Sequence, residues 1–221
     1  MLLDSKNAEI NAYQQIKRAI MLKRLLPGQK LSEEWISRNL NMSRTPVRAA
    51  FKKLEEERLV EIIPRRGAFV YEPTIKEIRD VFEVRIVLEC YAAKKAASMI
   101  SDQYISQLDE LIEKEKEAYE TRDFESFITI NNSIHQTPAI VTQNKSLIKQ
   151  INSLLNWSDC YIVLNDPFYN RSVDTAKNIP EHKKIVETLS NRNPLQAEKA
   201  VRTHLESTLN SLEEPKSIFD N

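Results

Sequence analysis

Glycine is nearly absent from this chain, since only Gly28 and Gly67 occur among its 221 residues. A loop that cradles a phosphate through its backbone needs several glycines close together, so no phosphate-binding loop of that kind is present. A nucleophile elbow, which needs glycine on both sides of a serine, is missing as well. We expect both glycines at sharp turns, because glycine adopts backbone conformations that other residues disfavour.

Cysteine is equally scarce, and Cys90 and Cys160 are the only two. Two cysteines cannot build a zinc or disulfide framework, and each lies in an apolar helical stretch, so we expect buried thiols. No apolar run approaches the roughly 18 residues that span a bilayer, which predicts no membrane partner. Residues 1–4 lack the basic and apolar regions of a signal peptide, and we expect the protein to stay in the cytoplasm.

The chain also lacks a net charge, because 32 Lys and Arg residues balance 32 Asp and Glu residues. The charges are nevertheless separated along the sequence: residues 1–74 hold 14 basic and 9 acidic residues, a net +5, so the remainder carries −5. A nucleic acid is a polyanion, and the basic part is therefore the expected contact surface. The length and the 41% hydrophobic content indicate two domains with a substantial core.

The most informative stretch lies in the basic part, at residues 42–54. Ser43 is a suitable N-cap, since its hydroxyl can accept a hydrogen bond from the first helical turn, and Pro46 fits in that turn. Apolar residues then recur at helical spacing and form one face. The cationic residues of another face are Arg44, Arg48 and Lys52.

The segments on either side complete a winged helix-turn-helix. Residues 31–40 form a short amphipathic helix capped by Ser32, and residues 39–42 are just long enough for the turn. Two β-prone runs, residues 59–63 and 68–71, flank a turn that carries two arginines. An ordinary solvated helix face would explain the cationic row alone, but it does not explain the preceding helix and the basic wing.

Four segments of this region resemble the N-terminal domain of GntR-family bacterial transcription regulators. They are residues 15–20, 26–31, 42–48 and 65–70. The resemblance covers nearly all of residues 10–72 and implies a DNA-binding domain. Members often carry glycine where this chain has Lys23, Asn41 and Arg58, and those glycines usually serve turns, so the departures concern local geometry.

For a winged helix of this kind we expect two classes of DNA contact. Arg44 and Arg48 are candidates for guanine contacts in the major groove, because a guanidinium can bind guanine through two hydrogen bonds. The remaining contacts fix the position of the protein on the phosphate backbone. The residues expected to make them are Ser43, Thr45, Lys52, Arg65 and Arg66. Arg66 and Gly67 are also expected near the minor groove.

From Ile75 onward every segment has the pattern of a helix. The expected spans are residues 75–99, 102–121, 123–140, 145–166, 176–190 and 194–213. Residues 165–172 have the composition of a loop. The predicted fold is mainly α, with a winged helix-turn-helix at residues 1–72 followed by an all-helical bundle of about six helices. We assign residues 73–77 to a linker, residues 78–213 to the bundle and residues 214–221 to a flexible tail.

The chain has only three histidines, and each lies on a different helix of the predicted bundle: His135, His182 and His204. Asn131 precedes His135 by four residues, so the two share a helix face. Helix bundles commonly build metal sites from such inward-facing residues. Three imidazoles with an oxygen ligand suit a divalent ion, zinc first, with nickel or manganese as alternatives. Taken singly, each histidine is better explained as a hydrogen-bonded helix residue that binds no metal, and the metal site is predicted from the three together.

These four residues resemble the ligand pattern of the FCD effector domain, which accompanies the winged helix in the fatty-acid-regulator branch of the GntR family. Residues 82–93, at the start of the first long helix, are similar to that domain too. Metal-binding members usually have aspartate where this chain has Asn131, whose neutral amide oxygen is a weaker ligand. The resemblance implies a dimerising, effector-binding domain, and six helices rather than seven resemble its VanR-like variant.

Arg85 interrupts an apolar stripe of the first long helix, because it shares a helix face with Ile78 and Val81. A buried guanidinium needs a partner. One candidate is a glutamate on a neighbouring helix. The other is the carboxylate of an effector, which the planar guanidinium can bind through two hydrogen bonds. Related regulators often sense small organic acids, and such an acid would also chelate the metal.

Together these features predict a homodimeric DNA-binding regulator that binds a pseudo-palindromic operator. We expect it to be a repressor. An effector changes operator affinity only if it binds two arrangements of the protein with different free energies. No enzyme activity is predicted, but two alternatives stay open. The histidines and Glu181 could form a hydrolase-like metal centre, or the bundle could serve only as a dimerisation scaffold.

Overall fold

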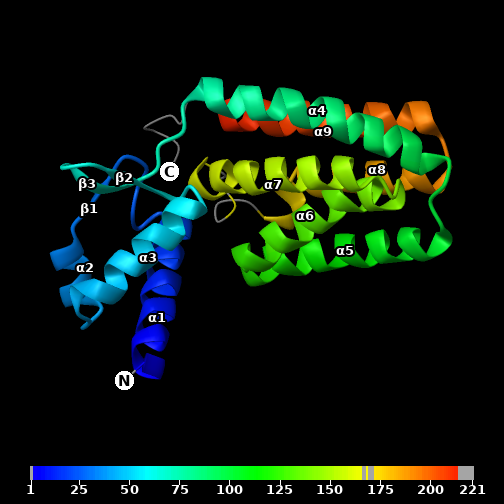
Figure 1. Cartoon of the computed structure of the whole chain (residues 1–221). Coiled ribbons are helices and arrows are strands. Elements are labelled where there is room, and N and C mark those ends of the chain that lie inside the picture. Colours follow the sequence, from blue (N-terminus) through cyan, green and yellow to red (C-terminus); the bar gives the residue numbers. More distant parts are fainter. Residues whose placement is uncertain (1, 166–167, 169–171, 214–221) are drawn as a thin grey trace. The chain divides into compact units, whose positions relative to one another are not determined.

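The computed structural model of the chain describes residues 2–165, 168 and 172–213. The tail predicted at residues 214–221, and most of the loop predicted at residues 165–172, lie outside these residues. Contacts divide the chain into two compact units, residues 1–74 with 160–165 and residues 75–159 with 166–221 (Figure 1). Residues 75–77, which the sequence assigns to a linker, form the first turn of a long helix.

The N-terminal unit contains a winged helix-turn-helix, as predicted. Its helices are α1 (Leu2–Met21), α2 (Glu33–Asn39) and α3 (Arg44–Glu56), and its strands are β1 (Lys30–Leu31), β2 (Val60–Ile63) and β3 (Gly67–Val70). The strands form an antiparallel sheet in the order β1-β3-β2, in which β2 and β3 are the wing. Strand β1 was not expected, because two residues are too short to show an alternating pattern.

The apolar face of α3 is the centre of this unit. Val47, Phe51 and Leu54 are buried against α1 and β2, as their helical spacing predicts. Burying a side chain of this size stabilises a fold by roughly 1.5–3 kcal/mol. Because this face is fixed in the core, the cationic face of the same helix is held toward solvent.

Several turns of this unit use the left-handed backbone conformation. Gly28 has a φ of +74°, and a Cβ atom at this position would lie 2.6 Å from a carboxylate oxygen of Glu72. Lys23, Asn41 and Arg58, the positions at which family members often carry glycine, have φ values of 56°, 52° and 58°. The chain therefore keeps the turn geometry without glycine, at a cost of roughly 1–2 kcal/mol for a residue with a Cβ atom.

In the described residues, the C-terminal unit is the predicted bundle of six α-helices, although residues 160–165, at the end of the fourth helix, are grouped with the N-terminal unit. The helices are α4 (Ile75–Ala97), α5 (Asp102–Thr121), α6 (Phe124–Val141), α7 (Lys145–Asn165), α8 (Asn178–Ser190) and α9 (Pro194–Glu213). Each predicted helix end lies within two residues of the observed one. Helix α8 begins at Asn178 rather than at residue 176, because Ala176 is extended and ends the short 3-10 helix η2 (Val173–Thr175).

The packing of the bundle brings helices that are distant in sequence into contact. Helix α4 lies along α9, and α8 contacts both α5 and α9 (Figure 1). Cys90 and Cys160 are both buried thiols, as predicted. Among the described residues, no helix is long and apolar enough to cross a membrane.

Candidate DNA-contact surface and metal centre

All eight residues predicted to contact DNA are exposed in the N-terminal unit. Five lie at the start of α3 or on it, and three lie at the tip of the wing. They are Ser43, Arg44, Thr45, Arg48, Lys52, Arg65, Arg66 and Gly67. The helix and the wing therefore each present cationic side chains to solvent.

The predicted capping hydrogen bond of Ser43 is wrong. Ser43 occupies the N-cap position of α3, with φ −72° and ψ 167°, but its side chain makes no capping hydrogen bond. The usual donor is the N–H group three residues on, and here that residue is Pro46, which has no N–H. At α2, where the third residue is Trp35, the predicted cap forms: the Ser32 hydroxyl accepts from the Trp35 N–H at 3.3 Å.

Two glutamates of α2 contact the predicted guanine-reading arginines. Arg48 Nε lies 2.8 Å from both carboxylate oxygens of Glu33, and Arg44 Nη2 lies 3.3 Å from a carboxylate oxygen of Glu34. Exposed ion pairs are weak because water screens both charges, so such pairs exchange readily for other acceptors. The glutamates therefore orient the arginines without removing them from solvent.

Contacts and backbone conformations within the wing itself fix the position of its tip. The guanidinium of Arg66 lies 5.6 Å from the ring centre of Phe69, within the range of a cation–π contact. Gly67 has a φ of +103°, and Arg65 has a φ of +65°. The tight turn therefore places both arginines at the end of the hairpin.

The structure brings the three histidines together in the interior of the C-terminal unit. His135 comes from α6, His182 from α8 and His204 from α9, and all three are buried. Nε2 of His204 lies 3.2 Å from Nε2 of His182 and 3.2 Å from Nε2 of His135. One nitrogen from each ring lies within 4.8 Å of the others, so a single ion can reach all three. Asn131 is buried one helical turn before His135.

Each histidine also has its own carboxylate partner at Nδ1. His135 is paired with Glu89 at 2.7 Å, and His182 is paired with Glu115 at 2.9 Å. His204 is paired with Glu181 at 2.8 Å. An ionised carboxylate only accepts hydrogen bonds, so each Nδ1 carries the proton and each Nε2 has a lone pair.

Three lone pairs directed at one point cannot hydrogen-bond to one another. A cation placed among them satisfies all three, and carboxylate–histidine pairing is the usual support for a metal-ligating imidazole. The donor set of nitrogen atoms, with a buried amide one turn away, suits a borderline divalent ion such as zinc. The chemistry of the cluster therefore fits a metal ion.

Burial favours the neutral form of two of these imidazoles, His135 and His204. Burial lowers the pKa of His135, and burial together with the neighbouring histidines lowers the pKa of His204 well below its ordinary value. Burial disfavours ionisation of Glu89, but Arg85 and His135 outweigh it and lower the pKa of that carboxyl to about 2. Neutral imidazole beside ionised carboxylate is the protonation state that metal binding requires.

Sequence reasoning did not single out Glu89 or Glu115 as partners of the histidines. Glu89 lies four residues after Arg85 on α4, a spacing that permits a contact between the two side chains. Glu115 lies on α5 among other Glu and Lys residues, so nothing in the sequence distinguishes it. Glu181, considered as a general base, instead pairs with His204 Nδ1, and burial raises its pKa.

Arg85 is buried as predicted, with 1% of its surface exposed. Its Nε donates to Glu89 Oε1 at 2.7 Å, and its Nη1 donates to Ser158 Oγ of α7 at 2.9 Å. The acidic partner lies on its own helix rather than on a neighbouring one. Nη2 is buried and has no hydrogen-bond partner among the residues that the structure describes, so these residues satisfy the guanidinium only in part.

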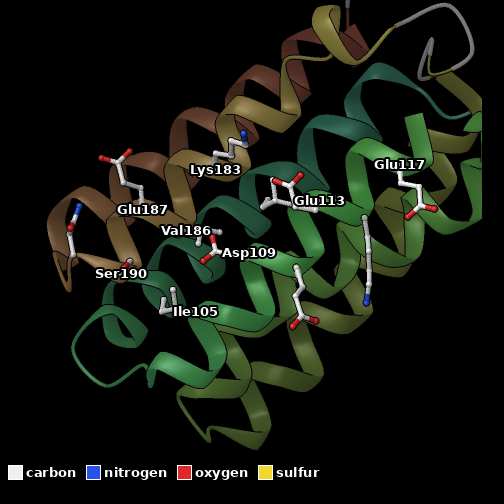
Figure 2. Close-up of a pocket in the computed structure, with 12 residues that line it drawn as sticks. Ile105, Asp109, Glu113, Glu117, Lys183, Val186, Glu187 and Ser190 are labelled. Carbon is white, nitrogen blue, oxygen red and sulfur yellow. The ribbon is translucent and has the colours of Figure 1, made fainter. Parts of the chain in front are cut away.

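A groove between α5 and α8 is lined by none of the predicted site residues. It has a volume of about 890 Å³. Figure 2 shows Glu113, Glu117 and Glu187 around it. Five acidic residues and two lysines line the groove, so its net charge is negative and disfavours contact with phosphates.

An exposed recognition helix and basic wing, followed by a helical domain with a buried histidine cluster, define a two-domain protein of the winged helix-turn-helix class. The chain belongs to the GntR family of bacterial regulatory proteins. The gntR family model matches residues 9–70, and the FCD domain model matches residues 80–207.

The chain is also similar to proteins that are named HTH-type transcriptional regulators. The chain is 35% identical to the HTH-type transcriptional repressor RspR of Escherichia coli K12 over 124 residues, which are 56% of this chain and 54% of RspR. It is 26% identical to YdhC, an HTH-type transcriptional regulator of Bacillus subtilis, over 87% of this chain and 85% of that protein. The chain thus spans about half the length of RspR.

The fold also matches solved structures. A GntR-type transcriptional regulator from Rhodococcus sp. RHA1 superposes with a TM-score of 0.69 at 24% identity, over 92% of this chain and 96% of that one. This likeness establishes the arrangement of elements. Members of the family are transcription regulators rather than enzymes.

Proposed function

We propose that this chain is a transcription regulator, acting as a repressor, that binds a pseudo-palindromic operator as a homodimer in the bacterial cytoplasm. The observation that carries the proposal is the exposed cationic face of α3 beside a wing with two arginines. Arg44 and Arg48 read guanines, and Ser43, Thr45, Lys52, Arg65, Arg66 and Gly67 hold the backbone. The name of RspR supports repression.

Substitution of Arg44 tests the DNA-binding proposal. We expect Arg44→Ala to cost roughly 1–3 kcal/mol of discrimination between the operator and a mismatched site, because alanine cannot form the two hydrogen bonds to guanine. Fluorescence anisotropy measures this with operators selected from random duplexes by the wild-type protein. Lys52→Ala is the matched control, and it should weaken binding to both sites equally. Unchanged selectivity in Arg44→Ala would remove Arg44 from base recognition.

We further propose that His135, His182 and His204 hold a divalent ion, zinc first and nickel or manganese as alternatives, with Asn131 or water supplying oxygen. Three converging Nε2 atoms, each backed by a carboxylate at Nδ1, support the proposal. The ion would act as a Lewis acid that binds the carboxylate of a small organic effector. Arg85 is the candidate for a second contact with that acid, because its Nη2 has no partner in the described part of the chain.

Metal content tests the histidine site directly. Wild-type protein purified without chelator should carry about one ion per chain by elemental analysis, and the variant with both His182→Gln and His204→Gln should carry none. Asn131→Asp should bind zinc more tightly than the wild type, because a carboxylate is a stronger ligand than an amide. A metal-free wild type would leave the bundle as a dimerisation scaffold and refute the site.

A panel of small organic acids, with their amides as uncharged controls, tests the effector contact. In the zinc-loaded protein, an acid that binds should raise the Tm, since a ligand that binds only the folded state stabilises it. Arg85→Gln should reduce that rise, because the bidentate donor is gone. Equal rises in both proteins would exclude Arg85 as an effector ligand.

A further inference from the structure

We propose that Arg85 is a positioning residue of the metal centre. It acts through Glu89, whose carboxylate contacts both Arg85 and the metal-binding His135. This inference rests on the proposed binding of metal by the three histidines. It gives Arg85 a role in the absence of any effector, and it gives an acid bound at Arg85 a physical path to the metal.

Glu89 is the carboxylate that joins the two groups. Its Oε1 accepts from Arg85 Nε at 2.7 Å, and its Oε2 is paired with His135 Nδ1 at 2.7 Å. The side chains of Glu89 and Arg85 are 3% and 1% exposed, so water does not substitute for either contact. With one oxygen held by Arg85, the other is fixed in direction toward the imidazole.

Arg85 is itself held from a third helix. Its Nη1 donates to Ser158 Oγ at 2.9 Å, and that hydroxyl donates to the backbone carbonyl of Leu155 at 3.0 Å. The guanidinium also lies 5.0 Å from the ring centre of Phe82. A continuous set of contacts therefore runs from α7 through Arg85 and Glu89 on α4 to His135 on α6.

The other two histidines provide internal controls. Glu181 pairs with His204, and Glu115 pairs with His182 and accepts from the Asn178 amide at 2.6 Å. Among the described residues, neither carboxylate forms an ion pair with an arginine or lysine within contact distance. Carboxylates behind metal-binding histidines typically change metal affinity about 10–100-fold, so each of the three should matter, but only Glu89 should depend on Arg85.

The test is the zinc affinity of the purified full-length protein, measured by competition with a chelator and without any acid. Arg85→Met should bind zinc about tenfold more weakly, because Glu89 loses the donor that fixes it. Arg85→Lys, which can still donate to Glu89, should stay within a fewfold of the wild type. Ser158→Ala, a smaller change that spares folding, should weaken binding in the same direction by a lesser factor.

Double substitutions distinguish two ways in which Arg85 could change zinc affinity. One is through its contact with Glu89, and the other is the direct electrostatic effect of its charge on the metal ion. Adding Arg85→Met to Glu89→Gln should weaken zinc binding no further, whereas adding it to Glu181→Gln should weaken binding by the full tenfold. Residues that act in one chain of contacts give non-additive effects, and independent residues give additive ones. The Nδ1–H proton resonance of His135 in the zinc-loaded protein should shift in Arg85→Met and stay in place in Glu181→Gln.

Three results would overturn the inference while leaving the metal site intact. The first is tighter zinc binding in Arg85→Met, which would show simple repulsion between the guanidinium and the metal ion. The second is an unchanged zinc affinity in Arg85→Met. The third is full additivity of Arg85→Met with Glu89→Gln. Absence of zinc from the wild type would instead refute the proposed metal site, and the inference with it.

Discussion

At the scale of single residues, burial sets the protonation of two histidines of the cluster. The pKa values of His135 and His204 are lowered, so the folded chain keeps both rings neutral at a pH where the unfolded chain protonates them. The unfolded state then binds more protons, and folding stability falls as the pH falls below about 6.5. The raised pKa of Glu181 has the opposite effect, because it makes the folded state more stable as the pH falls. It is one group, whereas the two histidines both lower the stability.

We predict that the metal-free protein loses stability between pH 7.5 and pH 5.5. Linkage gives roughly 1 kcal/mol per pH unit for each histidine that must stay neutral. Urea unfolding in the presence of chelator measures the change, and this window lies above the range in which Glu89 titrates. His204→Gln should show a smaller dependence on pH. A midpoint that is constant across the window would contradict the assignment of neutral histidines.

At the scale of elements, α4 has two faces with different tasks. One face is buried and carries Arg85 and Glu89, whereas the other leaves Val84, Val87 and Tyr91 exposed at 47%, 65% and 47%. These three residues lie one turn apart along the helix and form an apolar stripe. Contiguous exposed apolar surface of this kind is typical of protein contacts, and we propose this stripe as part of the homodimer interface.

Val87→Glu should therefore weaken the dimer, because an interface charge without a partner is costly to desolvate. Sedimentation velocity over a concentration series measures the change, and Glu83→Gln on the same helix should leave the dimer intact. Operator affinity should fall with dimerisation, since one winged helix makes too few contacts for tight binding. A dimer that persists unchanged in Val87→Glu would place the interface elsewhere.

At the scale of the whole molecule, charge is segregated by unit. The first 74 residues carry +5 and the rest of the chain carries −5, and the groove in Figure 2 belongs to the acidic part. Only the basic part should release counterions from DNA. The zero net charge of the chain thus conceals one unit suited to DNA and one that DNA repels.

The salt dependence of operator binding should follow this division. Arg65→Ala should reduce the slope of log K against log salt by about 1 for each phosphate that the protein no longer neutralises. The variant with Glu113→Gln and Glu117→Gln, which removes charge from the groove, should leave the slope unchanged. Anisotropy titrations at several salt concentrations provide both slopes. A change of slope in the groove variant would show that the acidic unit lies close to bound DNA.

Local patterns in the sequence were enough for much of this structure. The six helices of the bundle and the two helices of the helix-turn-helix follow from apolar residues that recur at the helical period, which depends only on neighbours in the chain. Burial of Arg85 followed from the same period. The family resemblance added the arrangement of the domains and drew attention to the three histidines.

Local sequence patterns gave a wrong prediction, or none, where the structure depends on a contact with another residue or strand. The hydroxyl of Ser43 has no capping role because Pro46 removes the donor, and strand β1 forms only because β3 lies beside it. The acidic partner of Arg85 proved to be Glu89, one turn along α4, rather than a residue of another helix.

The scarcity of histidine, with three in 221 residues, marked the candidate metal centre in the sequence, but only the tertiary structure supplied the groups around it. Glu89 and His135 are 46 residues apart, and Glu115 and His182 are 67 apart. A helical pattern shows which face of each helix is buried, but not which residues of two buried faces meet. That pairing depends on how the helices pack, and it turns three separate histidines into one candidate site.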